Sequence, residues 1–355
     1  MKHSLSHINV ASKPRRRPAS TYLRFALACL IAACVFPSDV SAVNIARGTR
    51  RAVVLTTDVG AEMDDQWTLA HLLVAPELDL RGVVTTHAPG LDTPAAETTA
   101  RVAREVLERI PHRGSTPVFA GSSVPLADER TPRTNPGVRF LIEESRHFDA
   151  GRRLAVLVTG AATDVASALL VDPSLAGRIE IVAMGFDEWQ HGGDSWNIKN
   201  DRAAWRVMLA SRAPLVIGNA AVTRRDLAMT RVRAREMFAA HGTTGDFLVR
   251  LLERWLDRDP AFTRQVTGQP DTWVIWDEVT TAYLLGMTRA DVRPRPRLRD
   301  DLSFEHDLRA RRKLLWVTSV DAPRLWRHFM KYLSCAKNSE RNLKRKKQSA
   351  KAAMA

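Results

Sequence analysis

Cysteine is scarce in this sequence of 355 residues, and its positions exclude two kinds of site. Of the three cysteines, Cys29 and Cys34 lie within the first 42 residues and Cys335 lies near the C-terminus. If the leader described below is cleaved after Ala42, one cysteine remains and no internal disulfide can form. The same scarcity excludes a metal site built from cysteine thiolates. A chain of this length can bury a core large enough to fold without disulfides.

Long apolar runs are also lacking, and the one of note lies near the N-terminus. Residues 25–36 form an apolar run of about a dozen, too short to span a bilayer. A basic run at residues 13–17 precedes it, and the small residues 40–42 follow. This order is typical of a secretory signal peptide, which we predict for residues 1–42. We therefore expect an exported protein, periplasmic or secreted, and a lipoprotein remains an alternative because residues 31–34 resemble a lipoprotein processing site.

Acidic residues are fewer than basic ones, and the formal net charge is +14. The excess lies at the two ends. Residues 1–42 carry six Lys and Arg against one Asp, and residues 337–355 carry seven against one Glu. A nucleic-acid-binding protein would spread its basic residues across a folded face. We therefore expect no nucleic-acid partner, and we predict that residues 335–355 form a basic disordered tail.

Between these ends, apolar runs typical of strands alternate with segments of helical periodicity. The predicted strands begin at Val53 and continue at residues 80–86, 117–120, 154–159, 179–184, 214–217 and 314–320. The predicted helices begin near Asp65 and continue at residues 93–110, from the 160–164 turn to about 170, 201–209, two within 226–258, 276–285 and 322–333. Repeated βα units predict an α/β fold, an open and mostly parallel sheet flanked by helices, over residues 43–334.

The first predicted strand ends in an acidic turn that contains Asp58, Gly60, Glu62, Asp64 and Asp65. Carboxylates so close in sequence repel one another unless a cation neutralises them. Ca²⁺ and Mg²⁺ bind oxygen ligands, so the turn is a candidate site for a divalent cation. The alternative is that the last two acids cap a helix N-terminus, where negative charge is favourable.

Other polar side chains also fall where a predicted strand gives way to a loop or helix. They are found in the 160–164 turn, at Asn197 and at Asp277. In a parallel sheet the carboxyl ends of the strands share one edge, so residues distant in sequence can converge there. Together they would form a cage of oxygen atoms suited to Ca²⁺.

Three blocks in this order resemble the inosine–uridine-preferring nucleoside hydrolases: the acidic turn, GAATDVASAL, and DSWNIKNDRAAW followed later by WDEVTTAYL. The resemblance covers residues 52–333. It implies an open α/β fold, a tightly held Ca²⁺ at the carboxyl edge of the sheet, and hydrolysis of the N-glycosidic bond of ribonucleosides. It also implies that the protein forms a homo-oligomer and acts on a small-molecule substrate.

The resemblance further implies a role for individual residues. Asp58, Asp65, Asp277 and the backbone carbonyl of Thr163 would bind calcium. Asp64 would be the general base that takes a proton from the attacking water. The resemblance also implies that Asn197 hydrogen-bonds the ribose hydroxyls.

Three features depart from the family pattern. Glu62 and Met63 lengthen the opening motif to Asp-x-Gly-x-x-x-Asp-Asp. Trp276 stands where the family often has a His that protonates the departing base, and a Trp cannot be a general acid. It can stack on a purine instead, which suggests a purine preference. Ser195 replaces the Glu that contacts the ribose 5′-hydroxyl.

Further residues are candidates for substrate contact. His87, His191 and Asp194 are alternative acids for the leaving base, with an ordinary structural role for each histidine as the competing interpretation. Trp196 is a candidate for the pocket wall. The predicted activity is calcium-dependent hydrolysis of purine ribonucleosides or of a related ribosyl compound. The alternative is an exported nucleoside- or sugar-binding protein that retains the calcium site but lacks turnover.

Overall fold

The computed structural model describes residues 50–193, 196–307 and 309–334. The predicted signal peptide (residues 1–42) and the predicted tail (residues 335–355) lie outside the described residues. Within the part of the chain that the structure describes, no helix is both long and apolar enough to cross a membrane.

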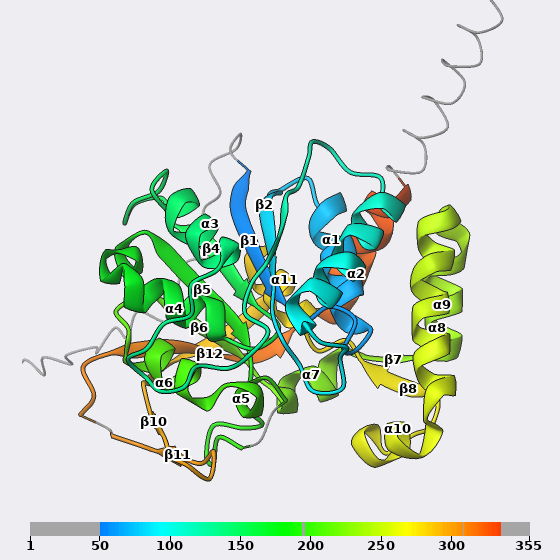
Figure 1. The fold of residues 1–355 in the computed structure, drawn as a ribbon. Helices are drawn as coiled ribbons and strands as arrows, with labels where there is room; N and C mark the ends of the chain where they lie inside the picture. The colour runs from blue at the N-terminus through cyan, green and yellow to red at the C-terminus, as the bar shows by residue number, and fades with distance from the viewer. Residues whose placement is uncertain (1–49, 194–195, 308, 335–355) are drawn as a thin grey trace, which may run out of the picture. The chain divides into compact units, whose positions relative to one another are not determined.

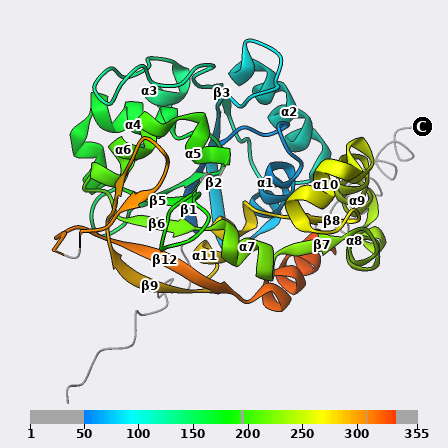
Figure 2. The ribbon, with the colours of Figure 1, turned by 90° about the horizontal axis from the view of Figure 1, so that it is seen from below.

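An eight-stranded sheet forms the centre of the fold, in the order β3-β2-β1-β4-β5-β6-β12-β9. Its strands are β1 Arg51–Thr57, β2 Leu78–Thr85, β3 Val118–Ala120, β4 Leu154–Val158, β5 Ile179–Met184, β6 Leu215–Gly218, β9 Thr288–Pro294 and β12 Lys313–Val320. Neighbouring strands are parallel except β12 and β9, which pair antiparallel at one edge (Figure 2). The predicted open, mostly parallel sheet is confirmed.

Apolar composition explains why the central strands lie where they do. All five residues of β4 are buried, as are the last five of β1. Continuous apolar runs of this kind are typical of parallel strands that are covered on both faces. β1 pairs with β4 in a register that places Leu55 opposite Leu157, so the two strands end side by side.

Helices cover both faces of this sheet (Figure 1). Their bounds are α1 Asp64–Val74, α2 Ala95–Arg109, α3 Pro136–Ser145, α4 Thr163–Val171, α5 Trp196–Asn200, α6 Arg202–Ala210, α7 Ala220–Asp226, α8 Arg231–Phe238, α9 Gly242–Arg258, α10 Pro260–Thr267 and α11 Glu278–Leu284; residues 322–334 are also helical. One core cluster contains buried residues of α1, α2, α9 and α11, among them Trp67. The other contains residues of α3, α4 and α6, among them Trp205.

Several elements were not predicted from the sequence. Two small antiparallel pairs lie outside the main sheet, β7 Ala228–Thr230 with β8 Thr272–Val274 and β10 Arg297–Leu298 with β11 Phe304–Glu305. Helices α3 and α10 were also missed. The predicted helix at 276–285 begins later, at Glu278, so Trp276 and Asp277 lie in the connection between β8 and α11. This difference matters because it leaves both side chains at the edge of the sheet.

Candidate active site

The sheet has a topological switch point between β1 and β4. From β1 the chain builds β2 and β3 on one side, and from β4 it builds β5 and β6 on the other. Open α/β sheets bind ligands in the crevice beyond the carboxyl ends of the strands at such a point. Asp58 follows β1 and Thr159 follows β4, so both lie at this crevice.

A glycine allows the two strand ends to approach closely. Gly160 lies so near to Asp58 that an added Cβ would stand 2.6 Å from the Asp58 nitrogen and 2.8 Å from its Oδ1. Contacts this short cannot form without moving the backbone of Asp58. The glycine in the 160–164 turn therefore positions the first carboxylate of the acidic turn.

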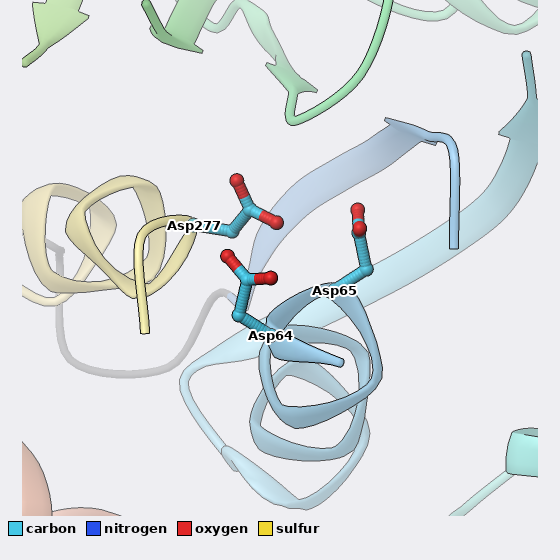
Figure 3. A group of neighbouring side chains, drawn as sticks. All are labelled: Asp64, Asp65 and Asp277. Atoms are coloured by element: carbon cyan, nitrogen blue, oxygen red, sulfur yellow. The ribbon is translucent and has the colours of Figure 1, made fainter. Parts of the chain in front are cut away.

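Three further carboxylates meet at the same edge (Figure 3). Asp64 and Asp65 begin α1, and Asp277 lies directly before α11. One ligand atom from each lies within 4.8 Å of the others. All three side chains are at most 3% exposed. Buried carboxylates need a partner charge or hydrogen bonds, so this group has the composition of a site for a hard cation.

The carboxylates of the acidic turn differ in how many hydrogen bonds they accept. Asp65 accepts from the hydroxyls of Thr57 and Thr159, the latter at 3.0 Å. Asp58 is as buried as the others, but its Oδ2 has no hydrogen-bond partner among the described residues. An orphaned buried carboxylate oxygen is costly, and a bound cation would satisfy it.

The pKa values of the four aspartates in the absence of a cation also favour a cation site. Burial, followed by repulsion from neighbouring carboxylates, raises the pKa values of Asp58, Asp64 and Asp277 well above their usual range. Burial raises the pKa of Asp65 to about 6, although hydrogen bonds from two threonines oppose the shift. Each of these groups would lose its proton more readily beside a positive charge.

A cavity of about 270 Å³ opens from the cluster. One end is acidic, and the other has an aromatic and apolar wall. Its lining residues are Asp58, Glu62, Asp64, Asp65, Thr159, Met184, Asp187, Trp196, Asn197, Ala220, Arg224, Phe262, Val266, Trp273, Trp276 and Asp277. A polar end beside a flat apolar wall fits a ligand that is part sugar and part aromatic ring.

Asn197 lies at this cavity, as predicted. Its side-chain nitrogen donates to the carbonyl oxygens of Thr159 at 3.0 Å and of Met184 at 3.1 Å. These bonds tie the ends of β4 and β5 together and fix the orientation of the amide. Its oxygen is the part of the side chain that remains to accept from a ligand.

Two predicted residues lie away from the cavity. The hydroxyl of Thr163 donates to Asp201, and its carbonyl accepts from Ser167 at 2.7 Å within α4. His87 is buried with its Nε2 3.0 Å from the Thr163 hydroxyl, and burial lowers the pKa of its ring. Neither is among the residues that line the cavity. The threonine brought to the carboxylates is Thr159, at the end of the strand rather than at the start of the helix.

Of the residues predicted to contact substrate from the 185–197 loop, some line the cavity and others do not. Trp196 lines the cavity and is 43% exposed. His191 is exposed, pairs with Glu188 at 2.7 Å, and does not line the cavity. Asp194 and Ser195 lie outside the described residues.

Sequence reasoning missed several residues of the wall. The sequence pattern marks Glu62 as part of an insertion but does not place it at the cavity, which it lines. Burial and the neighbouring Asp65 raise the pKa of Glu62 to about 8. Arg224, Phe262 and Trp273 come from α7, α10 and β8. No local motif marks them, because tertiary folding alone brings these elements together.

Comparison with known proteins identifies the fold family. The family model of the inosine-uridine preferring nucleoside hydrolases matches residues 53–327. No curated protein sequence gives a significant match. The family match covers both the switch point and the carboxylate cluster.

Solved structures agree in fold. The chain is similar to a purine-preferring ribonucleoside hydrolase from Gardnerella vaginalis, with a TM-score of 0.68 and 19% identity over 81% of this chain and 99% of that one. A plant nucleoside hydrolase gives a TM-score of 0.65 and 16% identity over 81% and 99%. An inosine-uridine preferring nucleoside hydrolase from Bacillus anthracis gives 0.62 and 18% over 80% and 99%.

These identities are low, so the structural likenesses establish the fold alone. The family model carries the assignment further, and it confirms the resemblance found in the three sequence blocks. The chain therefore belongs to the inosine-uridine preferring nucleoside hydrolase family and is a hydrolase acting on N-glycosyl bonds.

Proposed function

We propose that this protein hydrolyses the N-glycosidic bond of purine ribonucleosides, or of a related ribosyl compound, in a calcium-dependent reaction. The observation that carries the proposal is the buried group of Asp64, Asp65 and Asp277 at the acidic end of a cavity with an aromatic wall. The acidic end suits a polyhydroxylated sugar and a cation, and the aromatic wall suits a base.

The residues present fit a calcium ion. Asp58, Asp65, Asp277 and the carbonyl oxygen of Thr159 would hold it, with Thr159 taking the place that the sequence had suggested for Thr163. The donors are all oxygen atoms, which Ca²⁺ prefers. The orphaned Oδ2 of Asp58 supports this set. When bound, the ion would lower the pKa of a water molecule and orient the ribose hydroxyls.

Asp64 is the proposed general base. It is buried at the cavity, where its carboxylate lies beside those of the proposed ligands Asp65 and Asp277. In the reaction it takes a proton from the water that attacks the anomeric carbon. Asp58 is a second candidate, because its buried carboxylate lines the same cavity.

The remaining cavity residues would bind the nucleoside and stabilise the transition state. The amide oxygen of Asn197 would accept from a ribose hydroxyl. The buried carboxylates would stabilise the positive charge that develops on the sugar in an oxocarbenium-like transition state. Trp276 would stack on the purine ring.

Single substitutions at the two candidate bases test the assignment. We expect Asp64→Asn to lower kcat for release of free base from inosine by about 10²- to 10⁴-fold, while calcium content stays at the wild-type level. Asp58→Asn should lower calcium content and activity together. Measurement of base release and of bound metal on the same samples distinguishes the two roles.

Two results would contradict this account. Activity that survives in Asp64→Asn but vanishes in Asp58→Asn at full calcium content would make Asp58 the base. Bound calcium without turnover of any nucleoside by the wild-type protein would favour the alternative of a nucleoside- or sugar-binding protein.

Location and assembly belong to the same proposal. We propose that the protein is exported, because residues 1–42 have the pattern of a signal peptide. Export as a lipoprotein, with a lipid attached to Cys34, is the alternative. Family membership supports a homo-oligomer. Mass spectrometry of the mature protein and its mass in solution would test these points.

A further inference from the structure

The aromatic wall of the cavity carries a cation. Arg224 lies on α7, and its guanidinium carbon stands 5.4 Å from the centre of the Trp276 ring. It is the only Lys, Arg or His among the described residues that line the cavity, beside six carboxylates. A cation held over an indole ring gains cation–π energy, which restricts the long side chain to this position.

Arg224 forms no ion pair with any residue that the structure describes. Within residues 50–193, 196–307 and 309–334, no carboxylate lies within ion-pairing distance of its guanidinium. Its neighbour Arg225 differs, because its Nε contacts Asp226 at 2.7 Å and it does not line the cavity. The N–H donors of Arg224 therefore remain available to a ligand at the wall.

The position of Arg224 relative to the carboxylates decides which part of a ligand it meets. Trp276 directly precedes Asp277, which belongs to the acidic end. A nucleoside whose ribose lies among the carboxylates therefore places its base beside Trp276 and Arg224. This step depends on the proposed function.

The departing base needs stabilisation at this wall. When the C1′–N9 bond breaks, its electron pair goes to the purine, which becomes an anion. Trp276 cannot donate a proton as an acid. A guanidinium also keeps its protons, but its N–H groups can bind and stabilise a developing negative charge.

We propose that Arg224 binds the N7 and O6 edge of a 6-oxopurine and activates it as a leaving group. The water oxygen bonds to C1′ and gives its proton to the general base. The purine leaves with the C1′–N9 electron pair, stabilised by the guanidinium, and takes a proton from solvent on release. The products are ribose and the free 6-oxopurine.

The same contact sets the substrate class. A guanidinium presents two parallel donors, which match the N7 and O6 acceptors of hypoxanthine or guanine. Adenine presents an amino donor at the 6 position, so one of the two bonds is lost. A bidentate contact of this kind discriminates by about 10- to 100-fold. Inosine and guanosine are the expected substrates.

The test compares three substrates in the calcium-loaded protein. They are inosine, adenosine and p-nitrophenyl riboside, whose phenolate leaves without stabilisation of a base. The variants are Arg224→Met, which keeps the length without charge or donors, and Arg224→Lys, which keeps the charge. Arg225→Met is the matched control, since it makes the same charge change on the same helix outside the cavity.

For Arg224→Met we expect kcat/KM on inosine to fall by about 10- to 100-fold, with a smaller loss on adenosine and unchanged cleavage of the nitrophenyl riboside. Arg224→Lys should recover part of the loss, and Arg225→Met should match the wild type. Equal losses on all three substrates, or no loss on inosine, would overturn the inference while leaving the hydrolase intact. If wild-type protein with bound calcium cleaves none of the three, the proposed function fails and the inference fails with it.

Discussion

Gly160 shows how one residue controls the geometry of the carboxylate cluster. Its Cα faces Asp58, and a methyl group there would meet the backbone nitrogen of Asp58, which cannot rotate away. Gly160→Ala should therefore displace Asp58 and reduce calcium binding and base release together. Gly177→Ala is the matched control, because nothing lies within 4 Å of its added Cβ. Calcium content measured after dialysis checks the prediction, and wild-type content in Gly160→Ala would contradict it.

At the scale of single residues, the sequence does not show which of two threonines in the 159–164 segment lies beside the carboxylates. Thr159 and Thr163 are four residues apart and both precede or begin a helix. Sequence spacing indicates that the turn lies at the edge of the sheet but does not tell which threonine faces the acids. Packing decides it, because Thr163 is engaged with Asp201 and His87. The sequence does predict that Asp58, Asp64, Asp65 and Asp277 lie at this edge, because the end of a strand and the starts of two helices fix their positions.

At the scale of elements, a buried polar chain ties α1 to α11. Nδ1 of His71 on α1 lies 3.1 Å from Oε2 of Glu278 on α11, and both side chains are fully buried. Nε2 of His71 lies 2.9 Å from Nδ1 of His328 in the last helix. α1 carries Asp64 and Asp65, and α11 follows Asp277. This contact between the two helices therefore helps to fix the position of Asp277 relative to Asp64 and Asp65.

Removing one member of this chain should leave a buried carboxylate without its partner. We expect His71→Leu to lower the free energy of unfolding by about 3–5 kcal/mol. Urea unfolding with a chelator present measures this without a contribution from metal binding. The double variant His71→Leu with Glu278→Leu should recover much of the loss, since no charge is then buried alone. A double variant as unstable as the single one would show that the pair is not the cause.

The elements missed from the sequence share a physical reason. β9 and the pair β7–β8 are half-exposed or very short, so their hydrophobic alternation is weak. Helix α3 lies at the end of a long polar segment, where its start depends on a single cap by Asn135. The central strands were found because burial on both faces demands unbroken apolar runs.

At the scale of the molecule, the cavity combines parts from opposite ends of the chain. The acidic end comes from the ends of β1 and β4 and from the starts of α1 and α11, and sequence pattern could assign it to one sheet edge. The wall comes from α7, α10 and β8, whose placement depends on tertiary packing. The sequence could therefore place the carboxylates, Trp196 and Trp276 at one edge of the sheet, but not the wall residues Arg224, Phe262 and Trp273.

If the cluster binds calcium as proposed, activity should depend on calcium concentration and pH together. Without a cation, burial raises the pKa of Asp65 to about 6. Protons would therefore compete with calcium below that pH, and binding of the ion would release them. The calcium concentration needed for half-maximal activity should rise as the pH falls from about 8 to about 5.

Inosine hydrolysis by calcium-stripped protein, followed as calcium is added back, tests the central claim most directly. We expect no release of hypoxanthine in the presence of chelator, full recovery on addition of calcium, and a higher calcium requirement at the lower pH. Undiminished hydrolysis by the stripped protein would contradict a calcium-dependent reaction at this carboxylate cluster.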